Sequence, residues 1–180
     1  MCKILAEDKK EEEGFSKRVT QLIALTALVL AITATFSSLK AGAFASKGIL
    51  AQNQASDGWA YYQAKSLKEN TYQVQLDELE MGVVGVDPQR VEELKAKYRE
   101  KIERYAAEQK EISAMSKEKE AERDHFLELN RGFAGALTYL QIAILLVSLA
   151  ALVKQIYFWY IGMAVGLFGI YNFVAAMMMV

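Results

Sequence analysis

The stretch Met81-Gly82-Val83-Val84-Gly85-Val86-Asp87-Pro88 contains the only proline of this 180-residue chain. Glycine ends helices readily and adopts positive φ at little cost. Asp87 is a good N-cap for a helix whose first residue is Pro88, because proline lacks an N–H that this position would leave unpaired anyway. Residues 81–88 are therefore predicted to be the tip of a helical hairpin.

Most charged residues lie in the region around this tip, and the others lie in residues 1–18 and at Lys154. No charged residue occurs in residues 20–36, 132–153 or 155–180, whereas residues 40–131 contain 15 Lys and Arg and 17 Asp and Glu. Such segregation is typical of membrane spans joined to one extramembrane region. The near balance of charge offers no basic face for a nucleic acid.

These patterns predict an all-α membrane protein with the lipid bilayer as its surroundings. A polar tail at residues 1–18 precedes a transmembrane helix at 19–39. An extramembrane antiparallel, coiled-coil-like hairpin follows at 40–131, and two further transmembrane helices occupy 132–153 and 156–180. The hairpin arms, residues 40–80 and 88–130, are 41 and 43 residues long, so both reach about 60 Å at about 1.5 Å per residue.

Each arm contains apolar residues at heptad spacing, which indicates helix pairing. In the outgoing arm the row passes through Ser46 and Asn53 and is apolar at Leu39, Ala60, Leu67, Val74 and Met81. In the return arm it is Val91, Tyr98, Tyr105, Ile112, Phe126 and Phe133, with Lys119 as the one break. The complementary positions hold Leu94, Met115 and Leu129, and less favourably Lys101, Glu108 and Glu122.

The first apolar segment has one alternative interpretation. A secretory signal peptide would place its apolar part at residues 22–36 and its cleavage site at Ala41-Gly42-Ala43. The long, acidic leader disfavours this alternative. Cys2 is the only cysteine, which excludes an intrachain disulfide and leaves acylation conceivable, although no lipidation motif surrounds it.

The third apolar segment begins with an aromatic cluster, Tyr157, Trp159 and Tyr160, as is common at a membrane surface. Gly162 and Gly166 form a GxxxG motif with Gly169 nearby. Small residues at this spacing let helices approach closely. We expect this surface to pack against the second span or against another subunit.

Positive residues flanking the spans predict the topology. Lys17, Arg18 and Lys154 would lie in the cytoplasm, which places the N-terminus inside and the hairpin outside. Lys40, Lys47 and Arg131 near the base of the hairpin oppose this assignment, but long extramembrane regions count little in the rule. In a bacterium the hairpin would be periplasmic.

The sequence contains no recognisable chemical site. His125, the sole histidine, lies among charged residues and is most simply a solvated side chain. There is no zinc-binding pattern, P-loop or HExxH motif. No acidic or basic residue lies inside the spans except Lys154 at a boundary, whereas an ion path would normally require intramembrane charged groups. We therefore expect no catalytic residue, no cofactor and no metal.

One run is unusually rich in amides and aromatics, Asn53-Gln54-Ala55-Ser56-Asp57-Gly58-Trp59-Ala60-Tyr61-Tyr62-Gln63-Ala64-Lys65-Ser66. Asn53, Asp57 and Tyr61 share one face at helical spacing, with Trp59 and Tyr62 beside them. The run is either a helix–helix contact near the base of the hairpin or a surface that recognises a partner.

This run, with a span before it and a charged helical region and two spans after it, resembles the bacterial membrane family catalogued as domain of unknown function 4337 (DUF4337). Members of that family have a similar N-Q-A-S-D-x-W-x-x-Y-Q-A-K-S run. The resemblance covers essentially the whole chain. It implies a protein of the bacterial inner membrane and carries over no catalytic residue.

We expect a non-enzymatic structural or accessory membrane protein whose hairpin mediates homo-oligomerisation or docks on a larger membrane complex. Val83 and Val84 at the tip either pack on each other or are covered by a partner. The alternative is a membrane sensor that relays signals through a partner, because an 18-residue tail and a two-residue turn provide no output domain.

Overall fold

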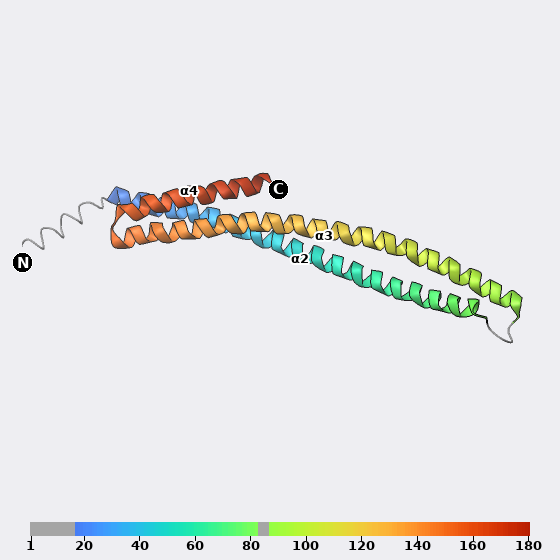
Figure 1. Ribbon diagram of the computed structural model, residues 1–180. Coiled ribbons are helices and arrows are strands. Elements are labelled where there is room, and N and C mark those ends of the chain that lie inside the picture. Colours follow the sequence, from blue (N-terminus) through green and yellow to red (C-terminus); the bar gives the residue numbers. More distant parts are fainter. Residues whose placement is uncertain (1–16, 83–86) are drawn as a thin grey trace, which may run out of the picture. The chain divides into compact units, whose positions relative to one another are not determined.

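The computed structural model describes residues 17–82 and 87–180, which form three helices (Figure 1). These are α2 (Lys17–Glu80), α3 (Pro88–Val153) and α4 (Ile156–Met178). The predicted all-α class is confirmed, as is the antiparallel packing of two very long helices. Each helix is long and apolar enough to cross a membrane. The tip residues Val83 and Val84 lie outside the described part of the chain.

The ends of the helices follow from local chemistry. Gly82, two residues after α2 ends, has a φ of +98°, a conformation that glycine adopts without strain. The Asp87 carboxylate accepts a hydrogen bond from the Gln89 N–H at 3.2 Å, and its carbonyl accepts one from Val91 N–H at 3.2 Å. Asp87 is therefore the N-cap and Pro88 the first residue of α3, as predicted. Between α3 and α4, Lys154 has a φ of 55°.

The chain divides into two compact units. The three-helix unit comprises Met1–Ser46 and Phe126–Val180, and the two-helix unit comprises Lys47–His125.

In the two-helix unit, α2 faces α3 through positions spaced alternately three and four residues apart. This set, the inner seam of α2, is buried or partly buried at every position: Gly48, Ala51, Ala55, Gly58, Tyr62, Lys65, Glu69, Tyr72, Leu76 and Leu79. The heptad row predicted from the sequence is a different one. Leu67 is 69% exposed and Val74 is 56% exposed, so the prediction that this row faces the return arm is wrong.

The prediction fails because α2 makes this contact through residue types other than large apolar ones. The inner seam combines small residues, which allow close approach of the helices, with tyrosine and long charged side chains, whose apolar parts pack while their polar ends find partners. On α3 the predicted row is confirmed, because Val91, Tyr98, Tyr105 and Ile112 are all at least partly buried. The prediction that Met115 is a seam position is wrong, since it is 59% exposed while the neighbouring Ser116 is 2% exposed.

The core of the three-helix unit is built around α3. Its wholly buried residues are again spaced by three and four: Phe133, Ala136, Leu140, Ala143, Val147 and Ala150. From α2, Ile23 and Leu30 join this core, and α4 packs on it through glycines. Ser37 Oγ donates to the Phe133 carbonyl at 2.7 Å and Asn130 Nδ2 to the Ala41 carbonyl at 2.8 Å, so polar groups between helices are satisfied.

Candidate functional site

The amide- and aromatic-rich run lies on α2 in the two-helix unit, around a close approach of α2 to α3. An alanine Cβ at Gly58 would overlap Ser116 Oγ and would lie 3.3 Å from Ser116 Cβ. Ser116 Oγ turns back to donate to the Ile112 carbonyl at 2.8 Å. Ala51 and Ala55 on the same seam are also buried. The two helices can therefore meet here because these residues of α2 have no side chain or a very small one.

Trp59 and Tyr62 belong to this helix contact. The indole Nε1–H of Trp59 donates to Glu120 Oε1 on α3 at 2.9 Å. The rings of Trp59 and Tyr62 meet edge to face, with centroids 5.6 Å apart, a favourable geometry for aromatic pairs. Both residues are partly buried.

Asn53, Asp57 and Tyr61 lie elsewhere. All three are exposed on α2, and the Tyr61 ring contacts the Lys65 ammonium at 5.0 Å from its centroid. Tyr61 also lines a surface groove of about 520 Å³, together with Gln54, Met115 and Glu118. The run predicted as one surface is thus two: Trp59 and Tyr62 face α3, and Asn53, Asp57 and Tyr61 face outward.

An ion pair crosses the seam one turn further along. Lys65 Nζ lies 2.6 Å from Glu108 Oε2 and 5.2 Å from the centroid of the Tyr105 ring. The pKa of Glu108 is lowered, chiefly because Lys65 donates to its carboxylate. The pKa of Lys65 is raised by the same contact and then by Tyr61. Beside this pair, Gln109 Nε2 donates to Glu69.

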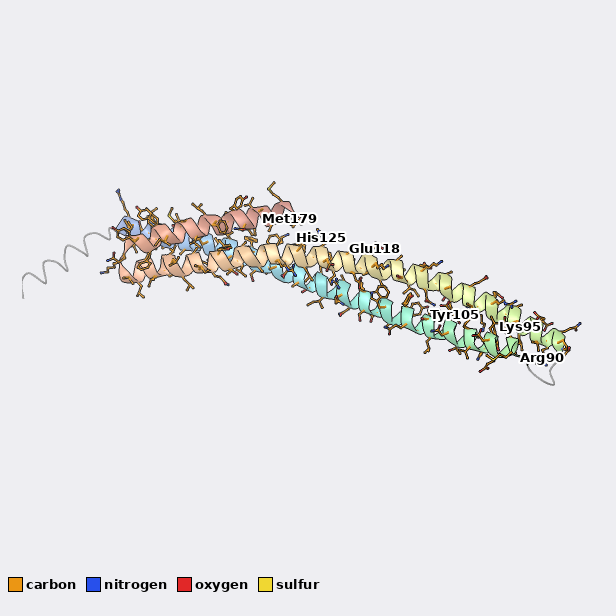
Figure 2. The ribbon with its side chains drawn as sticks, in the orientation of Figure 1. Arg90, Lys95, Tyr105, Glu118, His125 and Met179 are labelled. Carbon is orange, nitrogen blue, oxygen red and sulfur yellow. The ribbon has the colours of Figure 1, made fainter. Side chains whose placement is uncertain are left out.

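A tyrosine cluster continues the seam towards the tip. The Tyr72 ring lies 5.9 Å from that of Tyr105, which is labelled in Figure 2, and 5.4 Å from that of Tyr98. Lys101 Nζ donates to the Tyr72 hydroxyl at 2.8 Å. This hydrogen bond lowers the pKa of Tyr72 and raises that of Lys101. The seam therefore joins polar and aromatic groups rather than a continuous apolar stripe.

In the three-helix unit, the glycines of α4 face α3 and α2. A Cβ at Gly162 would lie 2.8 Å from Val147 Cγ2, and one at Gly166 would lie 2.7 Å from Leu30 Cδ2. Both glycines are buried. The close-packing surface expected of this motif is therefore occupied within the chain itself.

The family model described as Domain of unknown function (DUF4337) matches residues 19–179. The chain belongs to the DUF4337 family. No curated protein and no solved structure matches it.

For this DUF4337 chain, sequence reasoning missed much of the inner seam, including Lys65, Glu69 and Tyr72, and it also missed Ser116 on α3. The sequence carried only a partial signal, because small residues follow one another at spacings of three and four at Gly48, Ala51, Ala55 and Gly58. A search for apolar residues alone passes over it.

Within residues 17–82 and 87–180, no three His, Cys, Asp or Glu side chains are grouped so that they could hold a metal ion.

Proposed function

We propose that this DUF4337 protein is a non-enzymatic structural or accessory protein of the bacterial inner membrane. It crosses the bilayer at residues 19–39, 132–153 and 156–180. It presents the two-helix unit as a platform for assembly, either with copies of itself or with a larger membrane complex.

The observation that carries this proposal is the distribution of apolar side chains in the two-helix unit. Among the described residues of that unit, the buried hydrophobic ones are Ala51, Ala55, Leu76 and Tyr105. Larger apolar side chains such as Leu67 and Val74 are exposed. Hydrophobic burial is the main favourable term in association. A further helix packed on these exposed side chains would therefore add the hydrophobic burial that the pair of helices lacks.

The topology we propose follows the positive residues beside the spans. Lys17, Arg18 and Lys154 remain cytoplasmic, so the two-helix unit is periplasmic. Protease treatment of spheroplasts checks the orientation, and cleavage of residues 47–125 before lysis is expected. Cleavage that requires lysis would reverse the assignment.

Gentle extraction followed by native mass spectrometry tests the assembly role. A homo-oligomer, or a stoichiometric complex with another membrane protein, is the expected result. A monomer without a companion under conditions that preserve known membrane complexes would contradict the proposal.

A further inference from the structure

The outer face of α2 in the two-helix unit has a heptad row of its own. Starting at Leu50, positions spaced alternately by three and four residues lead to Glu78 and then to Met81, just after the helix ends, and every one of them is exposed. Its apolar members are Leu50, Ala60, Ala64, Leu67, Val74 and Met81. We call this row the outer seam. It lies opposite the inner seam, because the two rows are offset by two residues within the same seven-residue repeat.

The chemistry of the outer seam is unusual for a helix face that meets water. Of its members, only Asp57 and Glu78 are charged and none is basic. The outward positions of a paired helix are ordinarily charged. The exposed face of α3 follows that rule, with Glu93, Glu100 and Lys110 among its outward residues. Solvation of the hairpin therefore explains the outer face of α3 but not that of α2.

We infer that the outer seam pairs α2 with α2 of a second copy of this chain, in parallel and in register. This inference rests on the proposed function, because copies inserted in one membrane direct their α2 helices the same way. It deepens the proposal by naming the partner and the surface.

The period and charge of the row favour a second copy as the occupant. Its partner must be a helix with a row that carries few charges and has the same heptad period over roughly 30 residues, or about 45 Å. The outer seam is itself such a row. Parallel copies bring each member opposite its equivalent, without any further matching of length or height. A charged helix such as α3 would leave its charges unpaired against Leu67 and Val74.

The polar members of the outer seam set its register and limit its strength. In a parallel pair Asn53 faces Asn53, and a single asparagine within a seam specifies register and parallel orientation at a cost in stability. Asp57 and Glu78 also face their equivalents, and their repulsion weakens the pair. Asp57→Asn combined with Glu78→Gln is therefore expected to increase self-association.

Cysteine cross-linking of the full-length protein in native membranes tests the inference. In a Cys2→Ser background, Leu67→Cys and Val74→Cys are expected to give disulfide-linked dimers on mild oxidation, because facing seam positions fall within the Cα separation that a disulfide needs. Ala107→Cys and Ala114→Cys, which are exposed on α3, serve as matched controls. Dimer yield at the α2 positions should exceed that at the α3 positions about tenfold.

A second variant measures the contribution of the outer seam to self-association without cross-linking. Leu67→Glu combined with Val74→Glu should leave helix content unchanged, because both side chains are exposed. It should weaken self-association by more than about tenfold, since each buried unpaired carboxylate costs more than the 1.4 kcal/mol of one decade.

The outcomes separate this inference from the proposed function. One outcome is equal cross-linking on α2 and α3 with an oligomer or companion still present in native mass spectra. It overturns the pairing of copies through the outer seam and leaves the proposed assembly role standing. A monomer with neither copy nor companion overturns both. Selective cross-linking on α2 together with loss of the dimer in the glutamate variant supports both.

Discussion

Replacing Gly58 by alanine tests the close approach of α2 and α3 in the two-helix unit. The new Cβ would overlap Ser116 Oγ and would lie 3.3 Å from Ser116 Cβ and 3.8 Å from Ser116 Cα. Carbon atoms in good contact are about 3.5–4.0 Å apart. Rotation of the Ser116 hydroxyl relieves only part of the overlap, so the helices must also separate by a few tenths of an ångström.

The magnitude follows from three contributions. Rotating Ser116 Oγ away breaks its hydrogen bond to the Ile112 carbonyl, which is worth about 0.5–1.5 kcal/mol. Overpacking of a close contact costs about 1–3 kcal/mol. Alanine in place of glycine in a helix regains about 1 kcal/mol. The expected result for Gly58→Ala is destabilisation by about 0.5–3.5 kcal/mol.

Thermal unfolding of the full-length protein in mild detergent, followed by circular dichroism, measures this loss. For a chain of this size about 0.5–3.5 kcal/mol corresponds to a fall in Tm of roughly 1–14 °C. Gly42→Ala is the matched control, because Gly42 lies in the same helix and no atom would come within 4 Å of its Cβ. The control should be neutral or stabilising, since only the propensity gain applies.

A double variant completes the test. Gly58→Ala with Ser116→Gly moves the small residue to the other helix and should recover most of the lost stability. If Gly58→Ala raises Tm as much as Gly42→Ala does, the close approach at Gly58 does not exist in solution and the reasoning from this contact fails.

Two further substitutions test other contacts of the chain. Gly166→Leu should destabilise the three-helix unit by about 2 kcal/mol or more, because its Cβ alone would lie 2.7 Å from Leu30 Cδ2. Gly135→Leu is the control and should not destabilise the unit, because its Cβ would have no atom within 4 Å. Equal protease resistance of the two variants would refute this prediction. Glu108→Gln should make stability less sensitive to acid. Lys65 lowers the pKa of Glu108 below its ordinary value of 4.5, so the stability from this pair is present above that pH and is lost as the pH falls through the lowered pKa. Unfolding midpoints between about pH 7 and pH 3 should converge for the wild type and the variant, and parallel curves would show that the pair does not contribute.

Features that depend on local chemistry or on composition were predictable from the sequence. The cap formed by Asp87 before Pro88 depends on residues next to each other. The location of the three apolar segments depends on charge segregation, which a single pass along the chain reveals. The row on α3 was also predictable, because Val91, Tyr98 and Ile112 are conventional seam residues.

The α2 side of the contact was not predictable by the same means. Its inner seam contains Gly58, Lys65 and Glu69, which a search for apolar residues ignores. Gly58 fits because Ser116 is small, and Lys65 fits because Glu108 lies across the seam; neither fact is visible until the helices are paired. The candidate surface was divided for a similar reason, since Tyr61 and Tyr62 are adjacent in sequence but about 100° apart around the helix.

The side chains that α3 presents to α2 explain why the inner seam of α2, with its polar residues, faces α3. Lys101 and Glu108 on α3 are partly buried and require polar partners, which Tyr72 and Lys65 provide. Turning α2 by half a turn would set these charges against apolar side chains such as Leu67, at the cost of burying them unpaired.

A slip of one heptad is disfavoured by size as well as by charge. It would place Gln109 or Arg123 where Ser116 now meets Gly58, and both are too large for a contact at which even a Cβ overlaps. The inner seam therefore fixes the register of the two helices through size and charge. It leaves the large apolar residues of α2 on the opposite face, where α3 does not compete for them and a further helix can pack.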